Sequence, residues 1–139
     1  IGLSLVGSEM CIRDSSDTRS LGEDKSGDVL SERIKGAGHF VNAREITTDD
    51  EAKIIMQLRR LVERHDIDVI LSTGGTGLTG RDVTVEAHKK IYEKEIEAFG
   101  TLFTMISIEK IGTSAIQSRA TAGVSGGKYL FALPGSPGA

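Results

Sequence analysis

The chain has 139 residues, 38% of them hydrophobic and 27% charged, which predicts one globular domain with a buried core. Its formal net charge of −3 argues against binding nucleic acid through a general basic surface, although small anions held by local donors remain possible ligands. The single cysteine, Cys11, excludes a disulfide framework and favours a reducing cytoplasm, and no apolar run approaches the roughly 18 residues of a membrane span.

The first fifteen residues differ in character from the rest. Ile1, Leu3 and Leu5 alternate as in a short strand. Residues 1–15 as a whole resemble a string that recurs in unrelated proteins as translated sequencing-adapter read-through. We therefore predict that this segment is non-native and replaces the first strand, and that the domain proper spans residues 16–139.

An inner strand of a parallel sheet is buried on both faces and needs an apolar sequence. Glu9, Arg13 and Asp14 would bring unpaired charges to that position, at a cost of several kcal/mol each if they were buried. We accordingly expect residues 8–15 to be irregular or helical, and the residues that follow to be displaced from the edge of the sheet.

Helical and strand patterns alternate after residue 16. A helix of about ten residues should lie between Ser26, a candidate N-cap, and a stop signal at residues 37–38. A strand pattern follows at residues 39–46. A turn that ends at Asp50 then leads into a strongly amphipathic helix. Its apolar stripe comprises Ile54, Ile55, Leu58, Leu61 and Val62.

Residues 69–84 are the most distinctive stretch. The branched apolar residues 69–71 predict a buried strand, which passes directly into a loop rich in glycine and threonine at residues 73–77. Glycines let the backbone approach a ligand and present N–H groups to anionic oxygens, so this loop predicts a phosphate site. Asp82 lies at its far end and suggests a bridging divalent metal, and Thr84 is a candidate cap for the next helix.

Two known motifs overlap this loop. Gly75, Gly77 and Gly80 satisfy the dinucleotide-binding pattern G-x-G-x-x-G, but in that motif the helix begins within the glycines. A P-loop requires Lys followed by Ser or Thr, where this chain has Arg81 and Asp82. A flexible surface turn is the third alternative, and the density of glycines disfavours it.

The later elements continue the alternation. We predict two helices, a short helix and a final buried strand, at residues 85–95, 98–108, 112–116 and 128–133. This order predicts an α/β fold of three layers, in which a mostly parallel sheet without hairpins carries helices on both faces. The carboxyl ends of parallel strands share one edge, so Asp17, Asp49, Asp82 and the turn at residues 134–137 should converge there.

Several short motifs recur together in one known family. They are Ser16-Asp17-Thr18, Thr73-Gly74-Gly75-Thr76-Gly77, Arg81-Asp82-Val83-Thr84, Phe99-Gly100, Ser107, Gly112-Thr113-Ser114-Ala115, Ser118-Arg119 and Leu133-Pro134-Gly135-Ser136-Pro137. On these motifs residues 16–139 resemble the MoaB/MogA family of molybdenum cofactor biosynthesis proteins, relatives of the G domain of gephyrin, and the loop is closest to MoaB-type members. The family continues beyond Ala139 into a further helix, so we expect this chain to be truncated at its C-terminus.

The resemblance implies a molybdopterin-binding domain that assembles as a homotrimer or homohexamer and adenylylates molybdopterin with Mg-ATP. It assigns catalysis and Mg²⁺ binding to Asp49 and Asp82. The residues that it assigns to binding the pterin and the nucleotide are Ser16, Asp17, Thr73, Gly74, Gly75, Thr76, Gly77, Ser107, Ser114, Pro134, Gly135 and Ser136. The alternative is a non-catalytic molybdopterin-binding or carrier protein that keeps the loop without turnover.

The residues themselves leave some roles open. Asp49 precedes an amphipathic helix and is as well explained as a helix cap, and Asp82 could simply bond the backbone of its own loop. Ser114 could cap its short helix, offer the helix N-terminus to a phosphate, or do both. The three histidines have no spacing typical of a metal site, and we assign them no chemistry.

Overall fold

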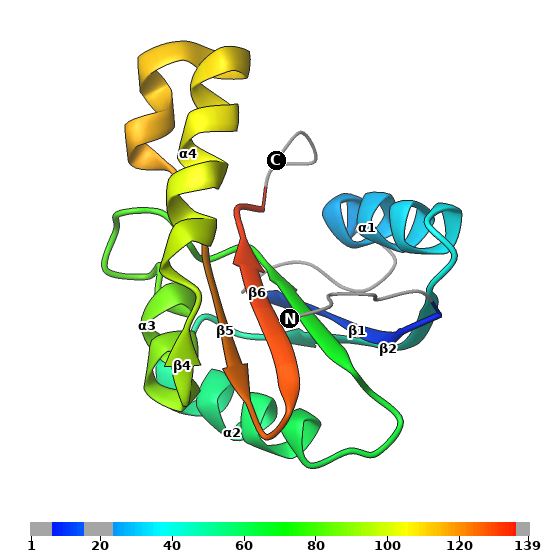
Figure 1. The fold of residues 1–139 in the computed structure, drawn as a ribbon. Coiled ribbons are helices and arrows are strands. Elements are labelled where there is room, and N and C mark those ends of the chain that lie inside the picture. The colour runs from blue at the N-terminus through cyan, green and yellow to red at the C-terminus, as the bar shows by residue number, and fades with distance from the viewer. Residues whose placement is uncertain (1–6, 16–23, 136–139) are drawn as a thin grey trace.

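A six-stranded sheet organises residues 7–15 and 24–135, which are the parts of the chain that the computed structural model describes (Figure 1). The strands are β1 Glu9–Ser15, β2 Phe40–Thr47, β3 Val69–Thr73, β4 Lys94–Glu95, β5 Thr121–Ser125 and β6 Lys128–Leu133. The helices are α1 Lys25–Gly36, α2 Glu51–Val62, α3 Thr84–Ile91, α4 Glu97–Ile111 and the 3₁₀ helix η2 Gly112–Gln117. The order of strands across the sheet is β2-β1-β3-β6-β5-β4.

The sheet is parallel on one side and antiparallel on the other. β1 pairs in parallel with β2 and β3, and β3 pairs in parallel with β6. β5 and β6 form an antiparallel hairpin whose turn contains Gly126 and Gly127, both with positive φ, and β4 pairs with β5. The α/β class is confirmed, but the expectation that the sheet has no hairpin is wrong. The β5 sequence Thr-Ala-Gly-Val-Ser carries too weak a strand pattern to reveal it.

Helices cover both faces of the sheet, as Figure 1 shows. On one face α2 and α3 pack on the sheet through a core of Cys11, Ile54, Leu58, Leu61, Ile67, Ile70, Ala87, Ile91 and Leu130. On the other face α1 packs on Met10, Ile12 and Val69 through Ile34. α4 extends past the end of the sheet, and η2 turns back beside it. The three-layer arrangement predicted from the alternation of elements is therefore present. Among the described residues no helix is both long and apolar enough to cross a membrane.

The expectation for residues 8–15 is wrong, because β1 is a packed central strand. Cys11 and Ile12 are buried, and so are the charged Arg13 and Asp14, which have 0% and 2% of their surface exposed. Glu9 lies at the amino end of the strand, where its N–H donates to Asp68. For Arg13 the charge penalty that argued against a strand is met by hydrogen bonds, which the sequence pattern did not reveal.

Polar partners surround the buried guanidinium of Arg13. Its Nε donates to Ser72 Oγ over 2.9 Å, one Nη donates to Ser15 Oγ and the other lies 3.4 Å from Gln57 Oε1. Burial lowers the pKa of Arg13 to about 10. Buried charges are tolerated when their donors are satisfied, so this network allows a charged residue to occupy an inner strand.

The network continues from Ser72 to α3. Ser72 Oγ lies 2.7 Å from His88 Nε2, and His88 Nδ1 lies 3.2 Å from the hydroxyl of Tyr92. His88 is fully buried, so its ring is a structural connector between β3 and α3.

Three local expectations also change. α1 is capped by Asp24, whose carboxylate accepts from Gly27 N over 2.8 Å, and Ser26 lies inside the helix. Thr84 is the first residue of α3 and does not cap it, since its hydroxyl donates to Ser15 Oγ over 3.0 Å. α3 ends at Ile91, earlier than expected, because the chain turns into β4.

The burial of His88 predicts a pH dependence of stability. Burial, and to a smaller extent the charge of Arg13, lower the pKa of His88 to about 3, whereas an unfolded chain titrates near 6.5. The unfolded state therefore binds more protons below pH 6.5, and the free energy of unfolding should fall by about 1 kcal/mol per pH unit as the pH decreases from about 6.5 to 4.5.

Urea unfolding of the wild type and of His88→Gln over this range measures the effect. The variant should lose most of the slope even if it is less stable at neutral pH. Equal slopes for the two proteins would contradict the assignment.

Candidate functional site

A cavity of about 360 Å³ lies at the carboxyl ends of the parallel strands. Its walls come from the end of β1, the loops after β2, β3 and β6, the last residue of η2 and the residue that follows it. The described residues that line it are Asp14, Ser15, Asp49, Gly74, Gly75, Thr76, Gly77, Arg81, Asp82, Gln117, Ser118, Pro134 and Gly135. The predicted convergence at one edge of the sheet is thus confirmed for Asp49, Asp82 and residues 134–135, whereas Asp17 and residues 136–137 lie outside the described residues. The cavity between these loops is suited to a small molecule.

The loop after β3 needs glycine at its start. Gly74 and Gly75 have φ of 86° and 69°, a region that side chains other than glycine rarely adopt. A Cβ on Gly74 would lie 2.8 Å from the carbonyl oxygen of Ser15, and the N–H of Gly74 donates to the carbonyl of Leu133 over 3.0 Å. The two glycines let the loop run directly against the ends of β1 and β6.

Asp82 is held by its own loop. Its Oδ2 accepts the hydroxyl of Thr79 over 2.7 Å and the N–H of Thr79 over 3.0 Å. The Thr79 hydroxyl, then the N–H groups of Thr79 and Gly77 and the charge of Arg119, lower the pKa of Asp82 against the opposing effect of partial burial. The carboxylate is therefore ionised at neutral pH and fixed at the cavity wall. Bonding within the loop and a role toward a ligand are compatible here.

Asp49 and Asp50 divide two roles between them. Asp50 caps α2, because its Oδ1 accepts the N–H of Lys53 over 3.0 Å. Asp49 is half-buried and lines the cavity, with its Oδ1 3.1 Å from the position of a Cβ on Gly75. The helix-cap explanation of Asp49 is therefore wrong, and its carboxylate belongs to the cavity wall.

The other predicted site residues fall into three groups. Thr76, Pro134 and Gly135 line the cavity, and Thr73 is buried behind it with its hydroxyl 3.2 Å from the carbonyl of Pro134. Ser107 on α4 and Ser114 on η2 are not among the described residues that line it. The hydroxyl of Ser114 instead lies 3.3 Å from the carbonyl of Ile111. The predicted residues Ser16, Asp17 and Ser136 lie outside the described ranges.

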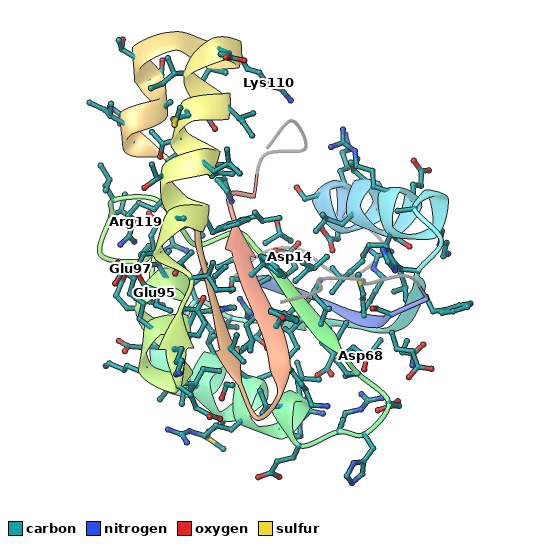
Figure 2. The ribbon with its side chains drawn as sticks, in the orientation of Figure 1. Asp14, Asp68, Glu95, Glu97, Lys110 and Arg119 are labelled. Carbon is teal, nitrogen blue, oxygen red and sulfur yellow. The ribbon has the colours of Figure 1, made fainter. Side chains whose placement is uncertain are left out.

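Five residues of the cavity wall are not among the site residues predicted from the sequence. They are Asp14, Ser15, Arg81, Gln117 and Ser118. Asp14, labelled in Figure 2, and Ser15 end β1 and were discounted with the rest of residues 1–15. The signal that could have found them is their position at the carboxyl end of a strand beside the loop of residues 73–77.

Asp14 also joins the site to α1. Its carboxyl contacts Asp24, and this contact, with the N–H of Gly27 and Arg44, keeps the pKa of Asp24 low although burial opposes ionisation. The cavity wall is therefore continuous with the N-terminus of α1.

The charged residues of the cavity wall determine which ligands and metal ions it can bind. The carboxyl groups of Asp14, Asp49 and Asp82 and the guanidinium of Arg81 line the cavity. Within the described ranges no three His, Cys, Asp or Glu side chains are grouped closely enough to hold a metal ion by themselves. Magnesium is commonly held by one or two carboxylates together with phosphate oxygens and water. The carboxyl groups of the cavity wall thus fit a cation that is also coordinated by the phosphate oxygens of a ligand.

Comparison with known proteins gives consistent matches over nearly the whole chain. The family model described as "Probable molybdopterin binding domain" matches residues 4–139. Molybdenum cofactor biosynthesis protein B of Bacillus anthracis is 50% identical over 125 residues, which are 89% of this chain and 74% of the relative.

Two solved structures extend the match to the fold. A crystal structure of a molybdenum cofactor biosynthesis protein B superposes with a TM-score of 0.92 at 47% identity, covering 95% of this chain and 83% of that one. The structure of the tungsten cofactor synthesizing protein MoaB from Pyrococcus furiosus superposes with a TM-score of 0.84 at 34% identity, covering 96% of this chain and 85% of that one.

The geometry of the loop predicts a difference between two of its glycines. Gly75→Ala places a methyl group 2.5 Å from Thr84 Oγ1 and 3.1 Å from Asp49 Oδ1 at a positive φ, so it should destabilise the fold by about 1–3 kcal/mol and displace Asp49. Gly80→Ala is the matched control, because a Cβ there meets no atom within 4 Å.

Thermal unfolding and nucleotide binding of both variants measure the contrast. Gly80→Ala should match the wild type in both. Equal behaviour of the two variants would contradict the close packing of the loop.

Proposed function

The chain belongs to the probable molybdopterin-binding domain family of molybdenum cofactor biosynthesis proteins, and from this premise we propose that its cavity binds molybdopterin and Mg-ATP and adenylylates the pterin. The observation that carries the proposal is that Asp49 and Asp82 line the same cavity as the glycine loop. Carboxylates beside a phosphate-sized loop suit a ligand whose negative charge is shared with a divalent cation.

The proposed reaction transfers an adenylyl group. An oxygen of the terminal phosphate of molybdopterin attacks the α-phosphorus of ATP, and a new P–O–P bond forms. The bond between the α-phosphorus and the oxygen that bridges to the β-phosphate breaks, and pyrophosphate leaves with that bonding pair. The protein contributes position and charge stabilisation to such a transfer, without a covalent step of its own.

The loop supplies the phosphate donors. Gly74 uses its N–H to bind Leu133, and the N–H of Gly77 faces Asp82. We assign the N–H groups of Gly75 and Thr76 to phosphate oxygens, because both residues line the cavity and follow the sharp turn at Gly74. The guanidinium of Arg81, at the same wall, is the charged donor for a further phosphate group.

The two aspartates would hold the cation. Asp82 holds its Oδ2 on Thr79, so we assign its other oxygen to the cation, and Asp49 lines the cavity from the loop after β2. Magnesium bound there would neutralise charge that develops on the phosphates during transfer. The hydrogen bonds from Thr79 fix the side chain of Asp82 and thereby orient its second carboxylate oxygen toward the cation.

Pyrophosphate release tests this function. The wild type should release pyrophosphate only when magnesium, ATP and molybdopterin are all present. Asp82→Asn and Asp49→Asn should each lower turnover by at least about 100-fold while molybdopterin affinity stays within about tenfold, because the carboxylates act through the cation.

Asp50→Asn is the matched control, because an asparagine still caps a helix and Asp50 lies outside the cavity wall. Its turnover should equal that of the wild type. If the protein binds molybdopterin but releases no pyrophosphate, the adenylyltransferase proposal is wrong and the protein is a non-catalytic pterin carrier.

The proposal includes a homotrimer or homohexamer, which the surface of α4 supports. α4 has no buried residue, and Leu102, Met105, Ile106, Ile108 and Ile111 are exposed. Between α4 and the sheet lies an apolar groove of about 440 Å³ that includes Phe99, Phe103 and Phe131. Exposed apolar surface of this extent is typical of an interface between subunits.

Sedimentation velocity tests the assembly. The wild type should sediment as a trimer or hexamer, and Met105→Glu should shift it toward the monomer by placing a charge in the interface. Met56→Glu is the control, because Met56 is exposed on α2, away from α4. A monomeric wild type would contradict the assembly.

A further inference from the structure

Arg119 holds the glycine loop from behind. Its Nε donates to the carbonyl oxygens of Thr76 and Gly77 over 2.9 and 3.0 Å, and one Nη donates to the carbonyl of Asp82 over 3.3 Å. Figure 2 labels Arg119 beside the loop that joins β3 to α3. Arg119 is not among the described residues that line the cavity, so it contacts the site through the loop.

Glu86 fixes the guanidinium in turn. The two carboxylate oxygens of Glu86, in the first turn of α3, accept from the two Nη atoms of Arg119 over 2.8 and 2.9 Å. The side chain of Arg119 is 32% exposed and that of Glu86 is 39% exposed, and ion pairs with that exposure add little net stability. The geometric effect of the pair is the larger one, because a bidentate contact sets the plane of the guanidinium.

The held carbonyls determine where the next N–H groups point. In a trans peptide the C=O of one residue and the N–H of the next point in opposite directions. Binding the carbonyl of Thr76 therefore turns the N–H of Gly77 away from Arg119 and toward the carboxylate of Asp82, whose pKa that N–H lowers. A Cβ on Gly77 would lie only 2.7 Å from Asp82 Oδ2, which shows how closely the two residues pack.

We propose that Arg119, oriented by Glu86, is a positioning residue that sets the conformation of the loop over residues 76–82 and thereby the direction of the Asp82 carboxylate. The proposal rests on the proposed function only for the role of Asp82 in turnover. Its structural part, the ordering of the loop by one guanidinium, stands independently. A lysine cannot replace Arg119, because one ammonium group cannot reach three carbonyls and a bidentate carboxylate in one plane.

Three variants test the proposal: Arg119→Lys, Arg119→Gln and Glu86→Gln. The controls are Arg33→Lys and Arg33→Gln, since Arg33 is exposed on α1. Amide hydrogen exchange over residues 76–83 should be about tenfold faster in both Arg119 variants and intermediate in Glu86→Gln, with exchange in α2 and β3 unchanged. Neither control should differ from the wild type.

Kinetics give the second measurement. The kcat for pyrophosphate release should fall about 100-fold in Arg119→Lys, while the KM for molybdopterin stays within about threefold, because a misdirected carboxylate affects the reacting phosphate more than the bound pterin. If the wild type releases no pyrophosphate, the proposed function fails and hydrogen exchange alone decides the positioning role. Wild-type exchange in Arg119→Lys, or faster exchange throughout the chain, would overturn the proposal.

Discussion

The close approach of the glycine loop to the ends of two strands is the constraint on which the site depends. Gly74 passes the carbonyl of Ser15 at a distance that admits no Cβ, and its N–H bonds Leu133 at the end of β6. These contacts fix the loop between β1 and β6. Asp82 then takes its direction from the same loop, so the backbone conformation at two glycines places the chemistry of the cavity.

Buried polar groups support this edge from below. Arg13, Ser72 and His88 form a hydrogen-bonded chain beneath the cavity, on the face that α2 and α3 cover. Each group is costly to bury alone, and the chain is acceptable because its members satisfy one another. The prediction that residues 1–15 are non-native concerns the origin of the segment and not its structure. The part over residues 9–15 nevertheless forms a complete inner strand whose last two residues face the cavity.

Much of the fold follows from hydrophobic periodicity, since strands β2, β3 and β6 and helices α1, α2 and α4 lie within a few residues of their predicted positions. The cavity follows from the rule that parallel strands end at one edge, which brought Asp49 and Asp82 together from distant parts of the chain. The predictions that were wrong have physical causes. Ala122 and Gly123 interrupt the strand pattern of β5, and two of the three partners of the buried Arg13, Ser72 and Gln57, are far away in sequence. The positions of Ser107 and Ser114 depend on how α4 and η2 leave the sheet, which local sequence does not encode.

The changes in backbone amide chemical shifts when Mg-ATP is added to the protein measure whether the glycine loop is the phosphate site. We expect the largest changes at Gly75 and Thr76, with smaller changes at Asp49 and Asp82, and little change in the apolar groove beside α4. Large changes confined to that groove, with the amides of the loop unaffected, would contradict this expectation.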